Sequence, residues 1–237
     1  MVSARREWLL LFDIDGTLLR TNGAGRESTR RALLEVYGTD GNMVDFHFGG
    51  RTDWQIVLDI LVESGLDEAG IVARLPDYQT SITRHLQEII AGFPVEACPS
   101  AVEVVQTLRF RPDVGLGLVT GNVGATAPVK LQAAGFDPAW FPVGAFGHEA
   151  QIRAALPPLA MQRAAAHYGA PFAPERVIVI GDTPADVECA RTAGALAVAV
   201  DTGFEDRAHL EAAQPDVLLD DLSGFLAAFE TLAASQR

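Results

Sequence analysis

The sequence predicts an α/β protein in which a doubly wound parallel sheet carries an inserted, all-helical cap. Short apolar runs alternate with amphipathic segments of helical periodicity along most of the chain. This alternation is typical of a parallel sheet covered by helices on both faces. One long stretch interrupts it and contains only helical patterns. We therefore expect a Rossmann-like core domain and a second, smaller helical domain.

Five apolar runs are expected to form the strands of the sheet. Each is a nearly continuous hydrophobic segment, as in strands that are buried on both faces. The expected strands are residues 8–14, 114–119, 177–180, 196–200 and 217–219. The helices between them are expected over residues 100–110, 127–136, 156–169 and 184–194.

The interruption lies between residues 21 and 93, where no segment has a convincing strand pattern. Glycine and proline in residues 20–26 and 92–100 suit hinge segments on either side. We therefore expect residues 1–20 and 94–237 to form the core domain and residues 21–93 to form the cap domain. Rigid packing of these helices on the core is the alternative to a moving lid. The expected cap helices are residues 27–38, 53–65 and 78–93.

Charge and composition restrict the partners of the protein. The 237 residues carry a formal net charge of −13, which repels nucleic acids and anionic membrane surfaces. No apolar run approaches the ~20 residues that a membrane-spanning helix requires. The two cysteines, Cys98 and Cys189, show neither metal-ligand spacing nor a paired framework. We expect a cytoplasmic protein, monomeric or homodimeric, that binds neither nucleic acid nor membrane.

Acidic residues follow directly on the first expected strand. Asp13 and Asp15 end the apolar run in "LLFDIDGTLL", where charges are costly unless they are compensated. Ligands of open parallel sheets bind beyond the carboxyl ends of the strands. Because polar residues follow three further strands, we expect one shared site at this edge. These residues are Thr120, Gly121 and Asn122, then Asp182 and Asp186, and finally Asp201 and Gly203.

Converging carboxylates at this edge predict a divalent metal and phosphoryl transfer. Mg²⁺ takes carboxylate, carbonyl, water and phosphate oxygens as ligands, and it relieves the repulsion between the acids. An aspartate can attack phosphorus, while a second acid protonates the leaving oxygen and then activates water. The hydroxyl of Thr120 could hold phosphoryl oxygens. A calcium loop of the EF-hand type does not fit, because Thr17 and Ala24 stand where acidic ligands would be needed.

Three motifs carry a family resemblance. "DIDGTLL", "VTGN" and "GDTPAD", in this order, resemble motifs one, two and four of the haloacid-dehalogenase-like (HAD-like) phosphohydrolases. The resemblance covers residues 9 to about 203, and the helical insertion is similar to the cap of the phosphoglycolate-phosphatase branch.

The resemblance implies a role for each matching residue. Asp13 would be the nucleophile and a Mg²⁺ ligand. Asp15 would be the general acid and base, with its backbone carbonyl on the metal. Thr120, followed by Gly121 and Asn122, would bind the phosphoryl group. Asp182 would complete the metal site, and Asp186 would support it.

The third motif departs from the family pattern. The family usually has a lysine before the helix that leads to motif four, and this region contains Arg153 instead. Lys130, on the helix after "VTGN", is the alternative for binding the phosphoryl charge, although the position of Arg153 fits better. In the cap, Arg51 lies in the polar segment "GGRTDW" and could bind a carboxylate or a second phosphate of the substrate. The alternative for this segment is a helix start, with Thr52 or Asp53 as the N-cap.

These observations predict a Mg²⁺-dependent phosphatase that hydrolyses a small phosphorylated metabolite through an aspartyl-phosphate. Phosphoglycolate is the first substrate that the cap type suggests, by analogy alone. A sugar phosphomutase of the same fold, similar to β-phosphoglucomutase, is one alternative. A non-catalytic binding module that kept the fold is another.

Overall fold

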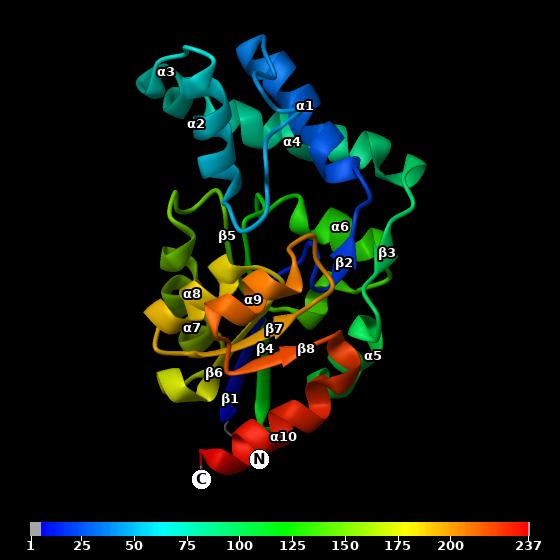
Figure 1. The fold of residues 1–237 in the computed structure, drawn as a ribbon, viewed down its shortest axis with the longest axis vertical. Coiled ribbons are helices and arrows are strands. Elements are labelled where there is room, and N and C mark those ends of the chain that lie inside the picture. Colours follow the sequence, from blue (N-terminus) through cyan, green and yellow to red (C-terminus); the bar gives the residue numbers. More distant parts are fainter. Residues whose placement is uncertain (1–5, 237) are drawn as a thin grey trace.

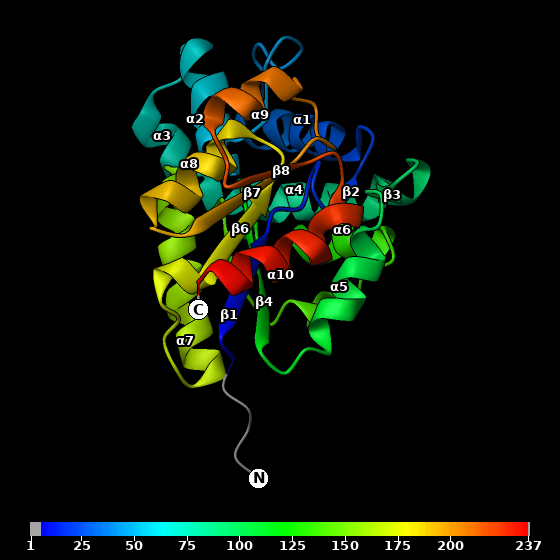
Figure 2. The ribbon, with the colours of Figure 1, turned by 60° about the horizontal axis from the view of Figure 1, so that its bottom comes forward.

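The computed structural model describes residues 6–236 and shows a six-stranded parallel sheet between two layers of helices (Figure 1, Figure 2). The strand order is β5-β4-β1-β6-β7-β8, and all neighbouring strands run parallel. The α/β fold predicted from the sequence is thereby confirmed. Residues 1–5 and 237 of the expected core domain lie outside the described part. The strands are β1 (Trp8–Phe12), β4 (Val114–Thr120), β5 (Val143–Phe146), β6 (Val177–Gly181), β7 (Leu196–Val200) and β8 (Val217–Leu219).

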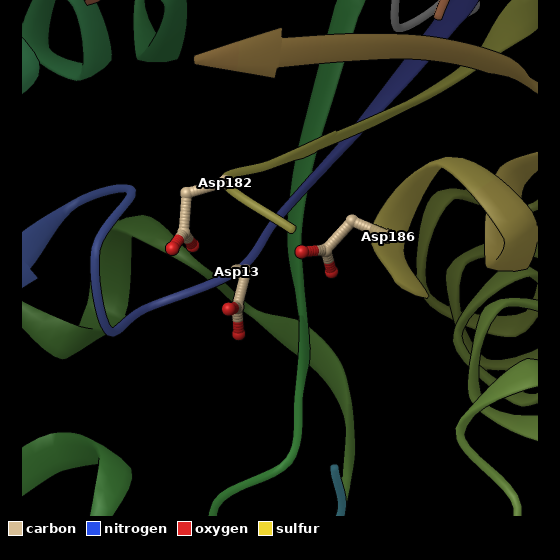
Figure 3. Close-up of side chains that lie close together, drawn as sticks. All are labelled: Asp13, Asp182 and Asp186. Carbon is tan, nitrogen blue, oxygen red and sulfur yellow. The ribbon is translucent and has the colours of Figure 1, made fainter. Parts of the chain in front are cut away.

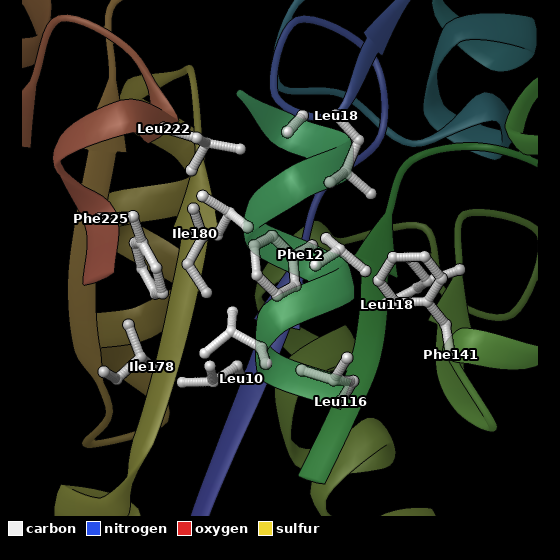
Figure 4. Packing of buried hydrophobic residues seen from close by; sticks show 14 of the residues in the cluster. Leu10, Phe12, Leu18, Leu116, Leu118, Phe141, Ile178, Ile180, Leu222 and Phe225 are labelled. Atoms are coloured by element: carbon white, nitrogen blue, oxygen red, sulfur yellow. The ribbon is translucent and has the colours of Figure 1, made fainter. Parts of the chain in front are cut away.

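Helices cover both faces of the sheet because the side chains of its strands alternate between two apolar clusters. Leu10 and Phe12 of β1 pack into one cluster, and Leu9 and Leu11 pack into the other. Figure 4 shows the first cluster, with Phe12 in its centre and Phe225 at a ring-centroid distance of 6.0 Å. The helices on this face are α5 (Ala101–Arg109), α6 (Ala127–Ala133) and α10 (Phe225–Ser235). Those on the opposite face are α7 (Leu156–Tyr168), α8 (Pro184–Thr192) and α9 (Arg207–Ala213).

The position of β1 in the sheet determines where the candidate site lies. β1 is a central strand, flanked by β4 and β6, and each of its residues is at most 2% exposed. The carboxyl ends of these three parallel strands therefore lie side by side. The backbone leaves β1 after Phe12, although the N–H of Asp13 still donates to Ile180 O at 2.9 Å.

Four helices of the insertion lie together beyond the carboxyl edge of the sheet (Figure 1). They share their own apolar cluster, which includes Leu33, Ile60 and Tyr78. A short antiparallel pair, β2 (Leu19–Arg20) and β3 (Glu96–Ala97), connects this unit to the core. As expected, the described residues 21–93 contain no strand. The helices are α1 (Ala24–Tyr37), α2 (Asp53–Glu63), α3 (Glu68–Ala73) and α4 (Leu75–Ile89).

Several elements were not predicted from the sequence: the edge strand β5 and the helices α3, α9 and α10. Among the described residues, no helix combines the length and the apolar character that crossing a membrane would require.

Candidate active site

Three aspartates from two distant parts of the chain meet at the carboxyl edge of the sheet (Figure 3). Asp13 follows β1, Asp182 follows β6, and Asp186 lies in the first turn of α8. Each is at most 5% exposed. One oxygen of each carboxylate lies within 4.8 Å of one oxygen of the other two. The predicted acids are thus brought together, and they form one cluster.

Local structure explains the orientation of Asp186. It is the third residue of α8, and its Oδ2 accepts from the N–H of Thr183 at 3.1 Å and from the Thr183 hydroxyl at 2.7 Å. This capping arrangement satisfies the start of the helix and turns the carboxylate toward β6. Gly181 is required beside it, because a Cβ there would overlap the Asp186 side chain.

Asp182 is held from the opposite side by the turn after β1. The hydroxyl of Thr17 donates to Asp182 Oδ1 at 3.0 Å. Gly16 has a φ of +85°, and a Cβ at this position would overlap the Asp182 carboxylate. The glycine of "DIDGT" therefore provides both a left-handed turn and the space for an acid from a distant strand.

The cluster is electrostatically unfavourable by itself. Burial raises the pKa of Asp13 to about 6, an effect that Arg153 opposes and that Asp186 and Asp15 reinforce. Burial and the neighbouring acids raise the pKa of Asp182 well above its usual range. Asp13 Oδ1 has no hydrogen-bond partner among the described residues. Such a set of buried, hard oxygen donors fits a Mg²⁺ ion.

Arg153 lies beside two of these carboxylates. Its side chain is buried, and its Nη2 lies 2.5 Å from Asp186 Oδ1 and 3.2 Å from Asp13 Oδ1. It belongs to the short 3₁₀ turn Arg153–Ala155, immediately before α7. The two acids keep the pKa of its guanidinium raised despite burial. The arginine at the third-motif position therefore lies next to the candidate nucleophile.

Lys130 lies in the same site but contacts a different acid. Its Nζ donates to Asp15 Oδ2 at 2.6 Å and to Asn122 Oδ1 at 2.5 Å. The amide Nδ2 of Asn122 donates to the same Oδ2 at 2.8 Å and to the Thr120 hydroxyl at 2.7 Å. Two donors thus hold one oxygen of the half-exposed Asp15 carboxylate.

The start of α2 brings the cap segment against the loop after β4. The N–H of Asp53 donates to Gly121 O at 2.7 Å, and its carboxylate accepts from the N–H of Val123 at 2.7 Å. A Cβ on Gly121 would overlap the backbone carbonyl of Arg51. Thr52 is the N-cap of α2, since its hydroxyl accepts from the N–H of Gln55 at 3.1 Å. "GGRTDW" is therefore a helix start, and its contact with the core was not predicted.

A cavity of about 410 Å³ lies between the helical insertion and the aspartates. Asp13, Asp15, Thr120, Lys130 and Arg153 line it on the core side. Its remaining walls include three aromatic residues that were not predicted from the sequence, because no motif connects them. They are Phe46, Phe48 and Phe204.

Comparisons with known proteins agree with this geometry. Residues 152–225 match the family model described as HAD-hydrolase-like. Pyrophosphatase PpaX of Bacillus cereus (strain AH820) is 28% identical over 218 residues, covering 92% of this chain and 94% of that protein. The structure of a hydrolase from Pseudomonas syringae aligns with a TM-score of 0.70 at 21% identity, covering 95% of this chain and 99% of that one. The structure of a predicted phosphoglycolate phosphatase from Haemophilus somnus 129PT aligns with a TM-score of 0.68 at 20% identity, covering 94% of this chain and 98% of that one.

Proposed function

We propose, from the premise that this chain belongs to the HAD-like hydrolases, that it is a Mg²⁺-dependent phosphatase acting on a small phosphomonoester. The observation that carries the proposal is the convergence of Asp13, Asp182 and Asp186 next to the Arg153 guanidinium. The segment 21–93 is proposed as the cap over this site, and residues 1–20 and 94–237 as the core.

The proposed reaction has two steps. A carboxylate oxygen of Asp13 attacks phosphorus, the bond from phosphorus to the ester oxygen breaks, and Asp15 gives that oxygen a proton. Asp15 then takes a proton from water as the water attacks phosphorus, which releases phosphate and restores the Asp13 carboxylate. Asp13, Asp182 and Asp186, with the backbone carbonyl of Asp15, would hold Mg²⁺. When bound, this ion supplies positive charge to the acids and the phosphoryl oxygens.

Arg153 and Lys130 are proposed to have different roles in this reaction. Arg153 lies next to Asp13, where its guanidinium suits two phosphoryl oxygens. Lys130 instead contacts Asp15 and Asn122, so we assign it to positioning the acid and base. Thr120, Gly121 and Asn122 line the cavity beside Asp13 and are proposed to bind the phosphoryl group.

A pyrophosphatase is the second candidate, because relatives that match nearly the whole chain are named for that activity. The two candidates share the aspartates, and they differ in the leaving group. Phosphate release from phosphomonoesters and from inorganic pyrophosphate, measured side by side, decides between them.

The test is Mg²⁺-dependent phosphate release by the purified full chain from a panel of phosphomonoesters. Asp13→Asn should lower turnover by more than about 10³-fold and leave the circular dichroism spectrum unchanged, because it removes the nucleophile. Asp201→Asn is the matched control: Asp201 was expected at the shared site, but its carboxylate pairs with Arg207, and it is not among the residues that line the cavity. An Asp13→Asn variant of normal activity would remove Asp13 from this role.

Other outcomes of the same assay identify the alternatives. An isomerised sugar phosphate without net phosphate release would indicate a mutase. Absence of turnover with every ester and with pyrophosphate would indicate a non-catalytic module.

A further inference from the structure

The cap side of the cavity indicates what the phosphoryl group is attached to. We propose that the substrate is a phosphomonoester whose leaving group is uncharged and partly apolar, such as a benzyl or alkyl alcohol. This inference rests on the proposed phosphatase function. It differs from pyrophosphate, phosphoglycolate and sugar bisphosphates, which all carry a second anionic group.

Arg51 already has an anionic partner within the protein. Its Nη1 donates to Asp59 Oδ2 at 2.9 Å, and its guanidinium lies over the Phe46 ring at 4.8 Å from the centroid. Sequence analysis expected Arg51 to bind a carboxylate or second phosphate of the substrate. In the structure Asp59 provides that carboxylate, so the charge offered to the cavity is largely compensated.

The other cationic side chains of the upper cavity are also engaged. Arg26 donates to the carbonyls of Met43, Val44 and Phe46, and it lies over the Phe48 ring at 4.7 Å. Arg20 donates through Nε to Thr202 O at 2.9 Å. Neutral carbonyl oxygens leave the charge of these two arginines uncompensated, but they occupy guanidinium donors for which a substrate anion would have to compete.

His47 of the cap also has an anionic partner. Its Nε2 lies 2.8 Å from Glu205 Oε1, across the boundary between cap and core. Among the described residues of the cap that line the cavity, every histidine and arginine therefore has a partner within the protein. An anionic leaving group would lose hydration and would have to compete with these partners for the donors of the cap.

Apolar and aromatic side chains form much of the cavity wall away from the aspartates. Ile56, Ile82 and Leu86 line the cavity from α2 and α4, and each is at most 4% exposed. Phe46 and Phe48 are half-buried and lie edge to face, with ring centroids 5.8 Å apart. Phe204 lines the cavity from the core and is 80% exposed. Apolar and aromatic walls with a few polar groups are typical of sites for organic ligands.

The cavity is also large compared with glycolate or a second phosphate. The volume of about 410 Å³ falls within the ~300–1,000 Å³ typical of sites for organic ligands, including drug-sized ones. Glycolate or a second phosphate would leave much of this space empty beside the aromatic walls. A larger leaving group with an apolar portion would fill it.

The test compares two para-substituted benzyl phosphates, one with a neutral substituent and one with a second anionic group. The full chain with Mg²⁺ is assayed for phosphate release from 4-methylbenzyl phosphate and from 4-carboxybenzyl phosphate, with phosphoglycolate and pyrophosphate as further substrates. We expect kcat/KM to be at least tenfold higher for the methyl compound than for the other three. Equal or reversed preference would overturn the inference and leave the phosphatase function standing. Absence of release from all four and from the wider ester panel would instead overturn the proposed function.

A variant tests the role of the ion pair directly. Asp59→Asn removes the partner of Arg51, so kcat/KM for 4-carboxybenzyl phosphate should rise at least threefold, while that for the methyl compound stays unchanged. Asp77→Asn is the matched control, because this exposed cap aspartate pairs with Arg74 outside the cavity. An unchanged value in Asp59→Asn would show that Arg51 is not kept from the substrate by Asp59.

Discussion

Lys130 is the only lysine of the chain, and it is buried at the candidate site. The sequence left two alternatives for binding the phosphoryl charge: Arg153, which precedes the helix leading to motif four, and Lys130, which lies on the helix after "VTGN". The structure separates them: Arg153 contacts Asp13, and Lys130 contacts Asp15. No periodicity could have shown this, because the direction of α6 relative to β1 determines which acid the lysine reaches.

This geometry predicts the consequence of removing the Lys130 charge. In Lys130→Met, kcat for an alkyl phosphate should fall by about 10²-fold or more with little change in KM, because Asp15 keeps only one of its two positioning donors. The kcat for an aryl phosphate such as p-nitrophenyl phosphate should fall much less, because its leaving group needs little protonation. Steady-state kinetics with both substrates provides the measurement.

The contrasting result for Lys130 is equally clear. If the lysine binds the phosphoryl group directly, the two substrates lose activity to the same degree and KM rises for both. Asp15→Asn serves as the reference, since it should show the same dependence on the leaving group.

At the scale of single elements, continuous apolar runs were predictable, even the three-residue β8, and interrupted or weakly periodic segments were not. β5 contains four residues, one of them glycine, and it lies between "FP" and "GHEA", which favour turns. α3 and α9 span six and seven residues, too few to establish a helical period. α10 is rich in alanine, leucine and phenylalanine, so its apolar face stands out poorly.

Asp53, at the start of α2, destabilises the folded protein when its buried carboxylate is ionised. Burial raises the pKa of Asp53 to about 6, opposed by Lys130 and by the N–H of Val123 and reinforced by Asp15. The folded state therefore binds the proton more tightly than the unfolded state, whose value is near 3.8. Ionised Asp53 destabilises the protein above about pH 6, and this effect disappears as the pH falls toward 4.

Asp53→Asn should consequently stabilise the protein at pH 7.5, by at most about 3 kcal/mol, since an asparagine oxygen can still accept from Val123 N–H. The difference in the free energy of unfolding between the variant and the wild type should be smaller at pH 5.0. Urea denaturation at the two pH values measures this difference. A variant that is less stable than the wild type by the same amount at both values would contradict the assignment.

At the scale of the whole molecule, the sequence predicted a core with an inserted helical unit but not how closely the two approach. The approach depends on backbone contacts: Asp53 N–H donates to Gly121 O, and Trp54 N–H donates to Gly147 O at 3.3 Å. Gly147 is needed there, because a Cβ would overlap the carbonyl of Gly121. Contacts of this kind leave little trace in residue type, so the cavity and its aromatic walls emerged only from the structure.

The buried acids lead us to expect that Mg²⁺ stabilises the whole molecule. Mg²⁺ binds the folded protein at Asp13, Asp182 and Asp186 in our proposal, so saturating metal should raise Tm. At a concentration of 100 times Kd the stabilisation is about 2.7 kcal/mol, or roughly 5–10 °C for a protein of this size. Asp182→Asn should raise Tm in EDTA, because one buried like charge is removed, and it should abolish most of the increase with Mg²⁺. Thermal denaturation with and without Mg²⁺, with Asp201→Asn as the control, measures both effects, and identical Tm values in Mg²⁺ and EDTA for the wild type would show that the cluster holds no magnesium.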